Sequence, residues 1–365
     1  MKLTNQNIVH ALLILLFCYI CSLFVVGLWP MNFRQHNTAA LDHQNGLTVS
    51  PPSTTYSQNP PQKLFNVKEF TILIDMTSDF PASKGFGSIV LYGLDYHDMN
   101  FLVGQWRSGI ELRIASDGHA RTISFGKKNV FRRGEQSLFA IVYDLNKFVL
   151  YHNGEKIATR RTGPLTFSRW NRSYPLVIGS DAKGHSTWKG AIQSIAIFDR
   201  ALPECEVQNT PVTIGKSSPL VCYTFTNNNG TTVRDCGAGT PATLIIPQRF
   251  VPYVRAVLEL PVNEWNKYSH NLLDITINLL GFIPLGIFLS MYLTHKNVTF
   301  KKSLLVSIVV GFAISFAIEI SQAFLSSRSS SMVDLLNNTL GSATGACLYY
   351  FRSTLLPKQG NRSWK

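Results

Sequence analysis

The sequence predicts a membrane protein of two parts, an antiparallel β-sandwich and a four-helix transmembrane bundle. Only 15% of the 365 residues are charged and 45% are hydrophobic, whereas an ordinary soluble domain has roughly 25% charged residues. The apolar residues concentrate in one N-terminal and three C-terminal runs. Between these runs, short strand-like segments recur without a long helical period. This distribution argues against a disordered chain and against an average soluble enzyme.

The first apolar run covers residues 8–29, and its clearly polar interruptions are His10 and Ser22. About 20 apolar residues are enough to cross the hydrocarbon core of a bilayer. A cleaved signal peptide is the alternative, but its apolar region usually has about 7–15 residues and ends at a small-x-small site. This run is longer and ends in Trp29-Pro30-Met31, so we expect a membrane span that is retained.

Three further spans are expected in the C-terminal part, at residues 272–293, 303–325 and 332–351. Basic residues flank the spans on one side: Lys2, Lys296, Lys301, Lys302, Arg352, Lys358, Arg362 and Lys365. The connection on the other side, between the third and fourth spans, holds only Arg328. Because basic residues favour the cytoplasmic side, we expect both termini in the cytoplasm and residues 34–271 outside the plasma membrane.

The formal net charge of +13 first suggests nucleic acid as a partner. Eight of the basic residues, however, belong to the cytoplasmic flanks of the spans, and much of the remaining excess is scattered over residues 34–271. Ordinary solvated surface is favoured there over attraction to anionic glycans or lipid head groups. We therefore expect membrane lipid, and no nucleic acid, as a partner.

The remaining sequence divides by composition. Residues 34–62 are rich in Pro, Ser, Thr and Asn and predict a flexible linker. Residues 63–247 contain about a dozen strand-like runs, and Asn153-Gly154 predicts a tight hairpin turn. Strands in series without helices predict a β-sandwich. Residues 248–271 predict an interfacial segment, with a loop as the alternative. The predicted domains are residues 1–33, 34–62, 63–247, 248–271, 272–352 and 353–365.

The segment from Phe148 to Ala158, which contains this hairpin, resembles the corresponding hairpin of LamG-type, concanavalin A-like (jelly-roll) domains. Residues 176–180, 188–192 and 197–202 are similar to strands that follow in the same family. The resemblance covers residues 65–246 and implies a sandwich fold that lectins and glycosidases share. The fold alone does not decide between binding and hydrolysis.

Retaining glycosidases of this fold resemble one another in a strand that reads Glu-x-Asp-x-x-Glu or Glu-x-Asp-x-Glu. That spacing does not occur within residues 34–271. Because glycoside hydrolysis needs a pair of carboxylates at short separation, we expect no catalytic activity from this domain. A domain that binds carbohydrate or protein is the remaining interpretation.

The candidate sugar-binding residues of the sandwich have flat side chains that could stack on a sugar ring: Tyr96, His97, Trp106 and Trp170. Trp106 and Trp170 could equally be core residues. Asp95 and Asp98 share one loop and could hold calcium, which prefers several oxygen ligands; the alternative is an ordinary turn. No other cofactor and no other metal site is predicted.

Three of the six cysteines lie outside the predicted spans. Cys222 and Cys236 flank one predicted hairpin, so we favour a disulfide between them in an oxidising compartment. Cys205 would then be unpaired. Three cysteines allow three pairings, and the other two pairings remain open.

Polar residues inside the predicted spans form sets that each occupy one helical face. Ionisable residues in lipid are costly and normally face the interior of a bundle or a wet cavity. With the expected topology, all of these sets meet at the outer end of the bundle. We therefore predict one ligand-binding polar cluster: Asp274, Asn278, Glu319, Gln322, Arg328, Asp334 and Asn338.

The spacing of this cluster also resembles a family. The segment from Asn278 to Gly286, which reads NLLGFIPLG, and the segment from Glu319 through Arg328 to Gly341 are similar to the motifs of VanZ-like membrane proteins. This resemblance implies a VanZ-like four-helix domain with the LamG-type sandwich inserted after its first helix. The family takes its name from a protein associated with low-level resistance to the glycopeptide teicoplanin.

The resemblance leaves two roles open for the polar cluster. It could bind a polar head group, such as that of a lipid-linked cell-wall precursor, or it could join the helices, since Gly341 and Gly345 permit close contact. We expect a non-catalytic cell-envelope protein, and the resemblance implies a role in glycopeptide tolerance. The alternative is a membrane enzyme or transporter that acts on a lipid-linked envelope substrate through Glu319, Arg328 and Asp334.

Overall fold

The computed structural model of the chain consists of two compact units. The first, here called the helical domain, comprises Met1–Phe33 and Arg255–Lys365, and the second, the sandwich domain, comprises Arg34–Val254. The structure describes residues 5–65, 67–79, 85–117, 122–209, 218–238, 241–255, 257–260, 271–325, 328 and 330–355.

The described residues of the helical domain form four long helices: α1 (Asn5–Leu28), α5 (Asn271–His295), α6 (Phe300–Gln322) and α7 (Met332–Leu355). Within the described residues, three segments are long and apolar enough to cross a membrane: Gln6–Leu28, Leu272–His295 and Phe300–Gln322. Helix α7 has 24 residues, about 36 Å at 1.5 Å per residue. It is not one of the three, because polar and small residues occur along its whole length. The chain is thus a multi-pass membrane protein, and the orientation inferred from four spans stays a prediction.

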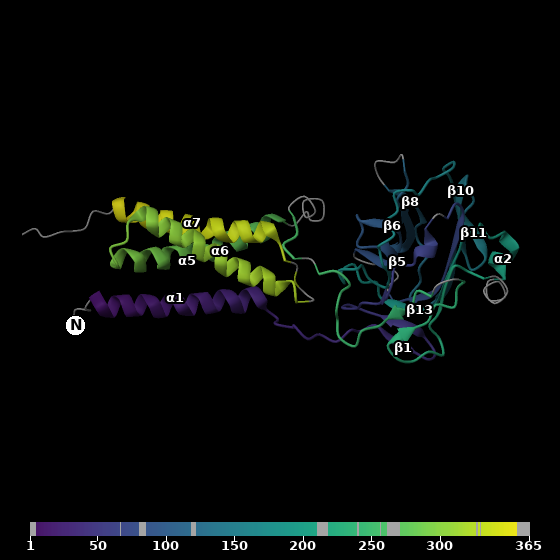
Figure 1. The fold of residues 1–365 in the computed structure, drawn as a ribbon, viewed down its shortest axis with the longest axis horizontal. Helices are drawn as coiled ribbons and strands as arrows, with labels where there is room; N and C mark the ends of the chain where they lie inside the picture. The colour runs from purple at the N-terminus through teal and green to yellow at the C-terminus, as the bar shows by residue number, and fades with distance from the viewer. Residues whose placement is uncertain are drawn as a thin grey trace, which may run out of the picture. The chain divides into compact units, whose positions relative to one another are not determined.

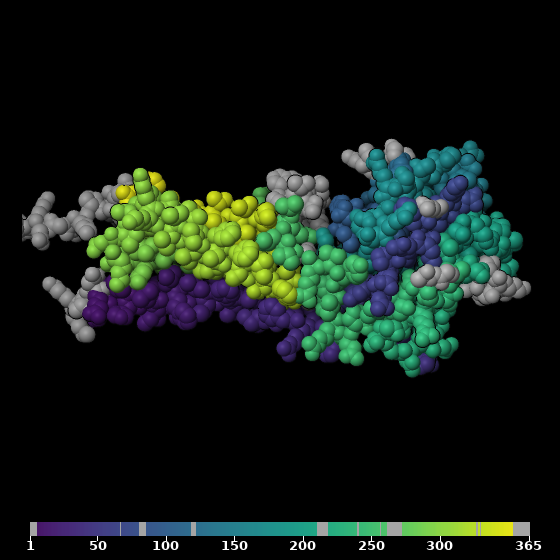
Figure 2. Space-filling model, in the orientation of Figure 1, coloured from purple at the N-terminus to yellow at the C-terminus, as the bar shows by residue number. Residues whose placement is uncertain are grey.

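Close backbone approach explains how α7 packs against α5. A Cβ atom added at Gly341 would overlap the carbonyl oxygen of Leu279, and one added at Gly345 would overlap that of Ile283. Small residues at such positions let two helices meet backbone to backbone. Helix α1 packs against α5 and α6 (Figure 1) and forms one long side of the helical domain (Figure 2).

The sandwich domain has two antiparallel sheets of eight strands each among the described residues. In spatial order, the first sheet consists of β1 (Ala40–Asp42), β2 (Gly46–Val49), β13 (Gly190–Phe198), β4 (Phe70–Ser78), β9 (Gln136–Tyr143), β10 (Lys147–His152) and β11 (Glu155–Arg161), with β14 (Val221–Thr224) paired to β13. The second consists of β15 (Thr232–Val233), β16 (Leu244–Ile245), β3 (Tyr56–Ser57), β12 (Leu176–Ile178), β5 (Phe86–Gly93), β6 (Met99–Trp106), β7 (Gly109–Ile114) and β8 (Ile123–Lys127). The short helices among the described residues are η1 (Gln62–Leu64) and α2 (Glu204–Gln208).

Alternation along the strands builds the core between the two sheets. On β4, for example, Ile72 and Ile74 face the core, while Leu73 belongs to a smaller apolar cluster on the opposite face. That second cluster includes Leu202 and Val207, which precede and form part of α2. Several central strands are therefore buried on both faces, which explains why their sequences read as continuous apolar runs as well as alternating ones.

The prediction of a flexible linker at residues 34–62 is wrong. These residues form β1, β2 and β3, and Leu47 is fully buried in the core. Asn37 fixes the start of the domain, because its side-chain amide donates to the carbonyls of Thr54 and Pro247 at 2.8 Å each. The strands have only two to four residues, too few for an alternating pattern, and serines and threonines are buried between them.

The same correction applies at the other boundary. The sandwich domain extends to Val254, so the first part of the predicted interfacial segment 248–271 belongs to it. Phe250 donates its backbone N–H to the carbonyl of Gln35 at 3.0 Å, which joins the last residues of the domain to its first. Residues 261–270 lie outside the described residues, and the interfacial prediction for them stays a prediction.

Candidate functional site

One cavity in the helical domain, here called the helix pocket, has a volume of about 470 Å³ and is lined by residues of α1, α5, α6 and α7. All seven residues of the predicted polar cluster line it: Asp274, Asn278, Glu319, Gln322, Arg328, Asp334 and Asn338. Apolar walls come from α1, through Leu23 and Val26, and from Phe282 and Ile318. The structure thus brings the predicted residues together, while their role in binding a ligand stays a prediction.

The course of the chain explains why these residues meet. The lining residues come from the C-terminal ends of α1 and α6 and from the N-terminal ends of α5 and α7. On α5, Asp274 and Asn278 are four residues apart, so they share a face. On α7, Asp334 and Asn338 have the same spacing. The ends of α5, α6 and α7 therefore each present a polar face to the same cavity, and the end of α1 closes it with an apolar wall.

Glu319 and Gln322 connect α6 to its neighbours. The Glu319 side chain is buried, with 1% of the residue exposed, and its Oε2 accepts the backbone N–H of Ser331 at 2.8 Å. The Ser331 hydroxyl in turn accepts the N–H of Asp334 at 3.2 Å, which is the pattern of a helix N-cap. Gln322 Nε2 donates to the carbonyl of Gly27 at 2.8 Å. These contacts hold the start of α7 and the end of α1 at the pocket.

Asn338 supplies a polar atom that the described part of the protein does not satisfy. The residue is 4% exposed, and its Nδ2 donates to the hydroxyl of Ser315 at 2.9 Å. Its Oδ1 is buried and has no hydrogen-bond partner among the described residues. Leaving a buried acceptor unpaired costs about 1–3 kcal/mol.

The charges at the pocket differ in exposure. Asp274 and Arg328 are exposed, Asp334 is half-buried and Glu319 is buried. Arg328 Nε donates to the backbone carbonyl of Trp29 at 3.2 Å, so the guanidinium is held beside the end of α1. Among the described residues, the lining therefore has three carboxylates and one guanidinium, and the Glu319 carboxylate is the most buried of them.

The predicted sugar-stacking residues of the sandwich have different surroundings. Tyr96 is half-buried between Phe86, at 5.2 Å between ring centroids, and the guanidinium of Arg113, at 3.9 Å. Trp106 ends β6 with 45% of its surface exposed, and its register partner on β5 is Phe86. His97 is exposed beside Tyr96. Trp106 thus belongs to the second sheet, whereas Tyr96 and His97 lie in the loop between β5 and β6. Sugar binding by these residues stays a prediction.

Trp170 is a core residue. It is 5% exposed, and its indole N–H donates to the carbonyl of Ala115 at 2.8 Å. Its ring packs against Phe167 and Tyr92 within the apolar core between the sheets. The proposed stacking of Trp170 on a sugar is therefore corrected: of the two interpretations that the sequence left open, the structure shows the core residue.

The loop proposed for calcium is a turn closed by a lysine. Asp95 Oδ1 accepts the backbone N–H groups of His97 and Asp98 at 2.8 and 3.0 Å, and Oδ2 lies 3.0 Å from Lys183 Nζ. Burial raises the pKa of Asp95, but these two amides and the ammonium outweigh it and hold the pKa at about 2. Because an ammonium group already neutralises this carboxylate, the residues present do not fit a calcium site.

A second cavity, here called the sheet groove, was not predicted. It has a volume of about 530 Å³ and lies on the outer face of β9, β10 and β11, beside the residues that lead into α2. Val142, Val149 and Tyr151 form an apolar floor, while Lys147 and Arg161 are register partners at its edge. The outward-facing residues of the hairpin were visible in the sequence as alternate positions of its strands. An alternating pattern, however, does not show on which face of a strand a groove will form.

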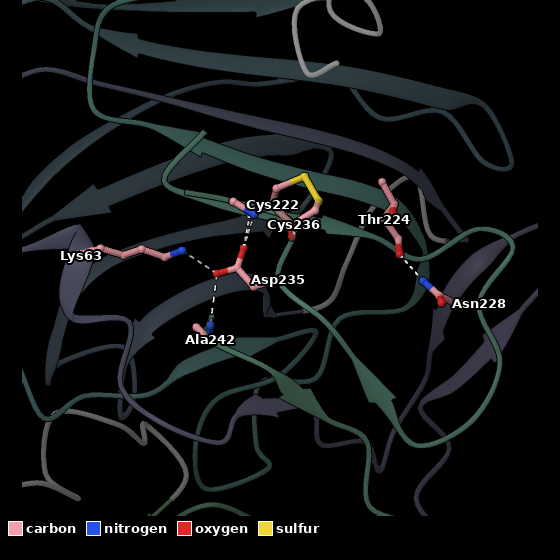
Figure 3. Close-up of a disulfide and its surroundings, with 8 residues drawn as sticks. Lys63, Cys222, Thr224, Asn228, Asp235, Cys236 and Ala242 are labelled. Carbon is pink, nitrogen blue, oxygen red and sulfur yellow. Dashed lines mark hydrogen bonds and ion pairs between the residues drawn. A yellow bond between two sulfur atoms is a disulfide. The ribbon is translucent and has the colours of Figure 1, made fainter. Parts of the chain in front are cut away.

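The predicted disulfide is present, since Cys222 and Cys236 are joined, and Cys205 is an exposed free cysteine. Figure 3 shows that the bond lies next to a buried ion pair. Asp235 Oδ2 lies 2.8 Å from Lys63 Nζ and accepts the N–H of Ala242, while Oδ1 accepts the N–H of Cys222 at 2.9 Å. The carboxylate therefore ties the disulfide to two other segments of the sandwich.

Taken together, the fold and the pocket define a multi-pass membrane protein with a polar cavity at one end of its helices and a separate β-sandwich. Residues 220–353 match the VanZ/LLP1 family, and residues 53–208 match the concanavalin A-like lectin/glucanases superfamily. The chain therefore carries a VanZ/LLP1 region together with a LamG-type, concanavalin A-like domain, as the motifs predicted. The VanZ/LLP1 match begins just before β14, so it includes the last strands of the sandwich.

Solved structures resemble the chain at low sequence identity. One is the CBM40 of Ruminococcus gnavus IT-sialidase bound to alpha2,3 sialyllactose, at 15% identity and a TM-score of 0.38, covering 46% of this chain and 96% of that one. Another is the NanB sialidase from Streptococcus pneumoniae, at 17% identity and a TM-score of 0.35, covering 48% of this chain and 28% of that one. The match thus spans less than a third of the NanB chain. No curated protein matches the chain in sequence.

Proposed function

We propose that this chain is a non-catalytic membrane protein of the cell envelope, whose helix pocket binds the polar head group of an envelope ligand and whose sandwich domain is a second binding module. The observation that supports the first part is the convergence of seven polar side chains, from separate segments, on one cavity. Its volume of about 470 Å³ falls in the range of roughly 300–1,000 Å³ that is typical of ligand sites.

A purely structural cluster would account for only part of the geometry. Contacts of Gln322 with Gly27, of Glu319 with Ser331 and of Asn338 with Ser315 do join the helices. Such bonds contribute roughly 0.6–2 kcal/mol each in membranes. They leave the open volume and the unpaired Oδ1 of Asn338 without a role. A bound polar group explains both, and ionisable residues in membrane proteins commonly mark such sites.

For the sandwich domain, we propose a location outside the plasma membrane and binding of carbohydrate or protein there. The sheet groove supports this, because it combines an apolar floor with charged residues at its edges, the combination expected of a ligand site. Lys147, Lys156 and Arg161 outnumber Asp144 and Glu204 around it. The exposed Trp106 offers a second contact surface on the other sheet.

The resemblance to VanZ-like proteins adds a physiological proposal, which is tolerance of glycopeptide antibiotics. Expression of the chain in a teicoplanin-susceptible bacterium is expected to raise the inhibitory concentration of teicoplanin. Glu319→Gln, produced at the same level in the membrane, is expected to lose this effect. The alternative function, a membrane enzyme or transporter acting through Glu319, Arg328 and Asp334, would instead require turnover or transport of a lipid-linked substrate in proteoliposomes.

Native mass spectrometry tests ligand binding by the helix pocket. The full chain is purified in mild detergent from the membranes in which it is made, and small-molecule adducts are measured. We expect the wild-type chain to retain an adduct that Asn338→Leu loses. Ser315→Ala removes the same interhelical hydrogen bond but keeps Asn338 Oδ1, so it is expected to retain the adduct. Equal retention by all three proteins would contradict the proposal.

A glycan array with the full chain in nanodiscs tests the sandwich domain. We expect binding to a defined class of glycan, weakened at least tenfold by Arg161→Glu in the sheet groove. Lys128→Glu serves as the control, because Lys128 is exposed and does not line the groove. A blank array with folded protein would remove the carbohydrate proposal and leave protein as the ligand class.

A further inference from the structure

We propose that the ligand of the helix pocket is a membrane lipid, which enters sideways from the bilayer between α1 and α5 and keeps its acyl chains outside the pocket. This inference rests on the proposed function of the pocket, and it specifies the chemical class of the ligand and its route of entry. Three features support it: the contacts of α1 along its length, the exposed residues at the edge of the cavity, and the division of its lining into polar and apolar parts.

Helix α1 contacts different neighbours along its length. At the pocket, the carbonyl of Gly27 accepts the side-chain amide of Gln322 at 2.8 Å, and a Cβ atom added at Gly27 would lie 2.8 Å from the side chain of Ile318. Both of these partners belong to α6. A contact with α5 lies deeper, where the Tyr19 hydroxyl donates to the carbonyl of Gly281 at 2.7 Å. Tyr19 precedes Gly27 by about 12 Å along α1, at 1.5 Å per residue. The end of α1 therefore packs on α6.

The cavity reaches the surface between α1 and α5. Val26 on α1 and Ile277 on α5 both line it, and they are 68% and 57% exposed. Both residues belong to segments that are long and apolar enough to cross a membrane, so we expect their exposed side chains to contact acyl chains. Gly281, which also lines the cavity, leaves open space, because no neighbouring atom among the described residues lies within 4 Å of an added Cβ. We call this opening, bounded by Val26, Ile277 and Gly281, the lateral slot.

The lining of the cavity is divided chemically. Its most buried polar residues are Glu319 and Asn338, which are 1% and 4% exposed. Beside the lateral slot the wall is apolar, since it consists of Leu23, Val26 and Ile277. A lipid matches both parts, because its head group can lie among the polar side chains while the first methylenes of its chain stay against the apolar wall, out of water. A polar molecule without a chain would make no use of this wall.

Deacylation tests the class of the ligand. The full chain is washed free of lipid in mild detergent and incubated with one of two probes: the lipid extract of the membranes in which it is made, or the water-soluble products of that extract after mild alkaline deacylation. Native mass spectrometry measures the adducts. We expect an adduct with acyl chains from the intact extract, and about tenfold less adduct from the deacylated products, which corresponds to about 1.4 kcal/mol. Equal or stronger binding of a product without acyl chains would overturn the inference while leaving the proposed pocket function intact.

Tryptophan substitutions test the route. Ile277→Trp and Val26→Trp place a bulky apolar side chain in the lateral slot and leave the polar residues of the pocket unchanged, so the lipid adduct is expected to fall about tenfold. Leu280→Trp and Val25→Trp are the matched controls and should keep it, because Leu280 and Val25 are 56% and 48% exposed on the same helices but do not line the cavity. Equal adducts in all four variants, whether kept or lost, would overturn the lateral route. Absence of any adduct on the wild-type chain would remove the proposed pocket function as well.

Discussion

The side-chain amide of Gln322 donates a 2.8 Å hydrogen bond to the backbone carbonyl of Gly27, which joins the ends of α6 and α1 across 295 positions of sequence. Helix α1 also contributes Leu16 to the apolar cluster of α5 and α6, and Tyr19 donates to the carbonyl of Gly281 at 2.7 Å. The first helix is thus packed into the helical domain through both apolar and polar contacts. This is the relationship expected of a retained span.

Loss of the Gln322 contact is the first prediction. Gln322→Met keeps the length of the side chain but removes the donor, so the Gly27 carbonyl loses its partner. We expect a loss of about 0.6–2 kcal/mol of stability and weaker packing of α1. A cysteine pair at Gly27 and Ile318, whose side chains would be adjacent, should crosslink less efficiently in the variant. Unchanged crosslinking and unchanged Tm would contradict the prediction.

The second prediction concerns the contact between α5 and α7. Gly345→Ala places a methyl group against the carbonyl oxygen of Ile283, and overpacking of this kind typically costs about 1–3 kcal/mol. Gly281→Ala is the matched control, because nothing lies within 4 Å of its added Cβ and alanine is favoured over glycine in a helix by about 0.8–1.0 kcal/mol. Thermal unfolding of the full chain in detergent should therefore show a lower Tm for Gly345→Ala only. A lower Tm for Gly281→Ala as well would contradict the prediction, because neither a close contact nor helix propensity would explain that loss.

Much of the site could be predicted from the sequence because membrane burial makes polar residues conspicuous. A carboxylate in an apolar run has few tolerable positions, so Asp274, Glu319 and Asp334 pointed to one interior face before any contact was known. The convergence on one cavity follows from helix ends that alternate along the chain. The unpaired Oδ1 of Asn338, by contrast, depends on the exact position of Ser315, which no periodicity specifies.

The sandwich was less fully predictable, for a different physical reason. Long strands such as β4 and β9 could be predicted from their apolar content. The hairpin could be predicted from its Asn153-Gly154 turn. The strands β1, β2 and β3 have only two to four residues each, so they are too short to show an alternating pattern in the sequence. Their order comes from long-range bonds, such as those of Asn37 to Thr54 and Pro247. The composition of a segment indicates how polar it is. Whether the segment is ordered depends on long-range contacts such as these, which composition does not show.

The third prediction concerns the disulfide. Removing the Cys222–Cys236 bond, which closes a separation of 14 residues, is expected to cost about 3 kcal/mol in the chain-entropy model. Cys236→Ser should lower the Tm of the sandwich domain and abolish its sensitivity to reductant. Cys205→Ser is the control, since Cys205 is exposed and free, and should leave both unchanged. A wild-type chain whose unfolding is insensitive to reductant would argue against the bond.

The fourth prediction concerns Asp235, which pairs with Lys63 at 2.8 Å beside the disulfide. The Asp235 side chain is fully buried and that of Lys63 is 13% exposed. Removing one partner of a buried pair typically costs about 3–5 kcal/mol, because the other charge is left uncompensated. Asp235→Asn is therefore expected to destabilise the sandwich more than Cys236→Ser does. Denaturant unfolding of the two variants under oxidising conditions compares them directly, and the reverse order would be evidence against the assigned role.

The last prediction is an acid dependence of sandwich stability that arises from Asp95. Its pKa is held at about 2 in the folded chain, below the value of about 3.9 for an unperturbed aspartate. A carboxyl group whose pKa is lower when folded stabilises the fold above its unfolded pKa, and this contribution is lost as the pH falls through the folded pKa. The side chain is 8% exposed, so a contribution of about 2 kcal/mol is expected, lost between pH 4 and 2.

Lys183→Met isolates this contribution, because it removes the ammonium that lies 3.0 Å from Asp95. The variant should be less stable than the wild-type chain at pH 7, and the two should converge as the pH approaches 2. Arg132→Met is the control, since its pair with Glu135 is 82% and 45% exposed, and exposed pairs contribute about 0–1 kcal/mol. Chemical unfolding of the sandwich domain within the full chain, measured at each pH, provides the comparison. A difference between Lys183→Met and wild type that stayed constant from pH 7 to pH 2 would show that Asp95 does not cause it.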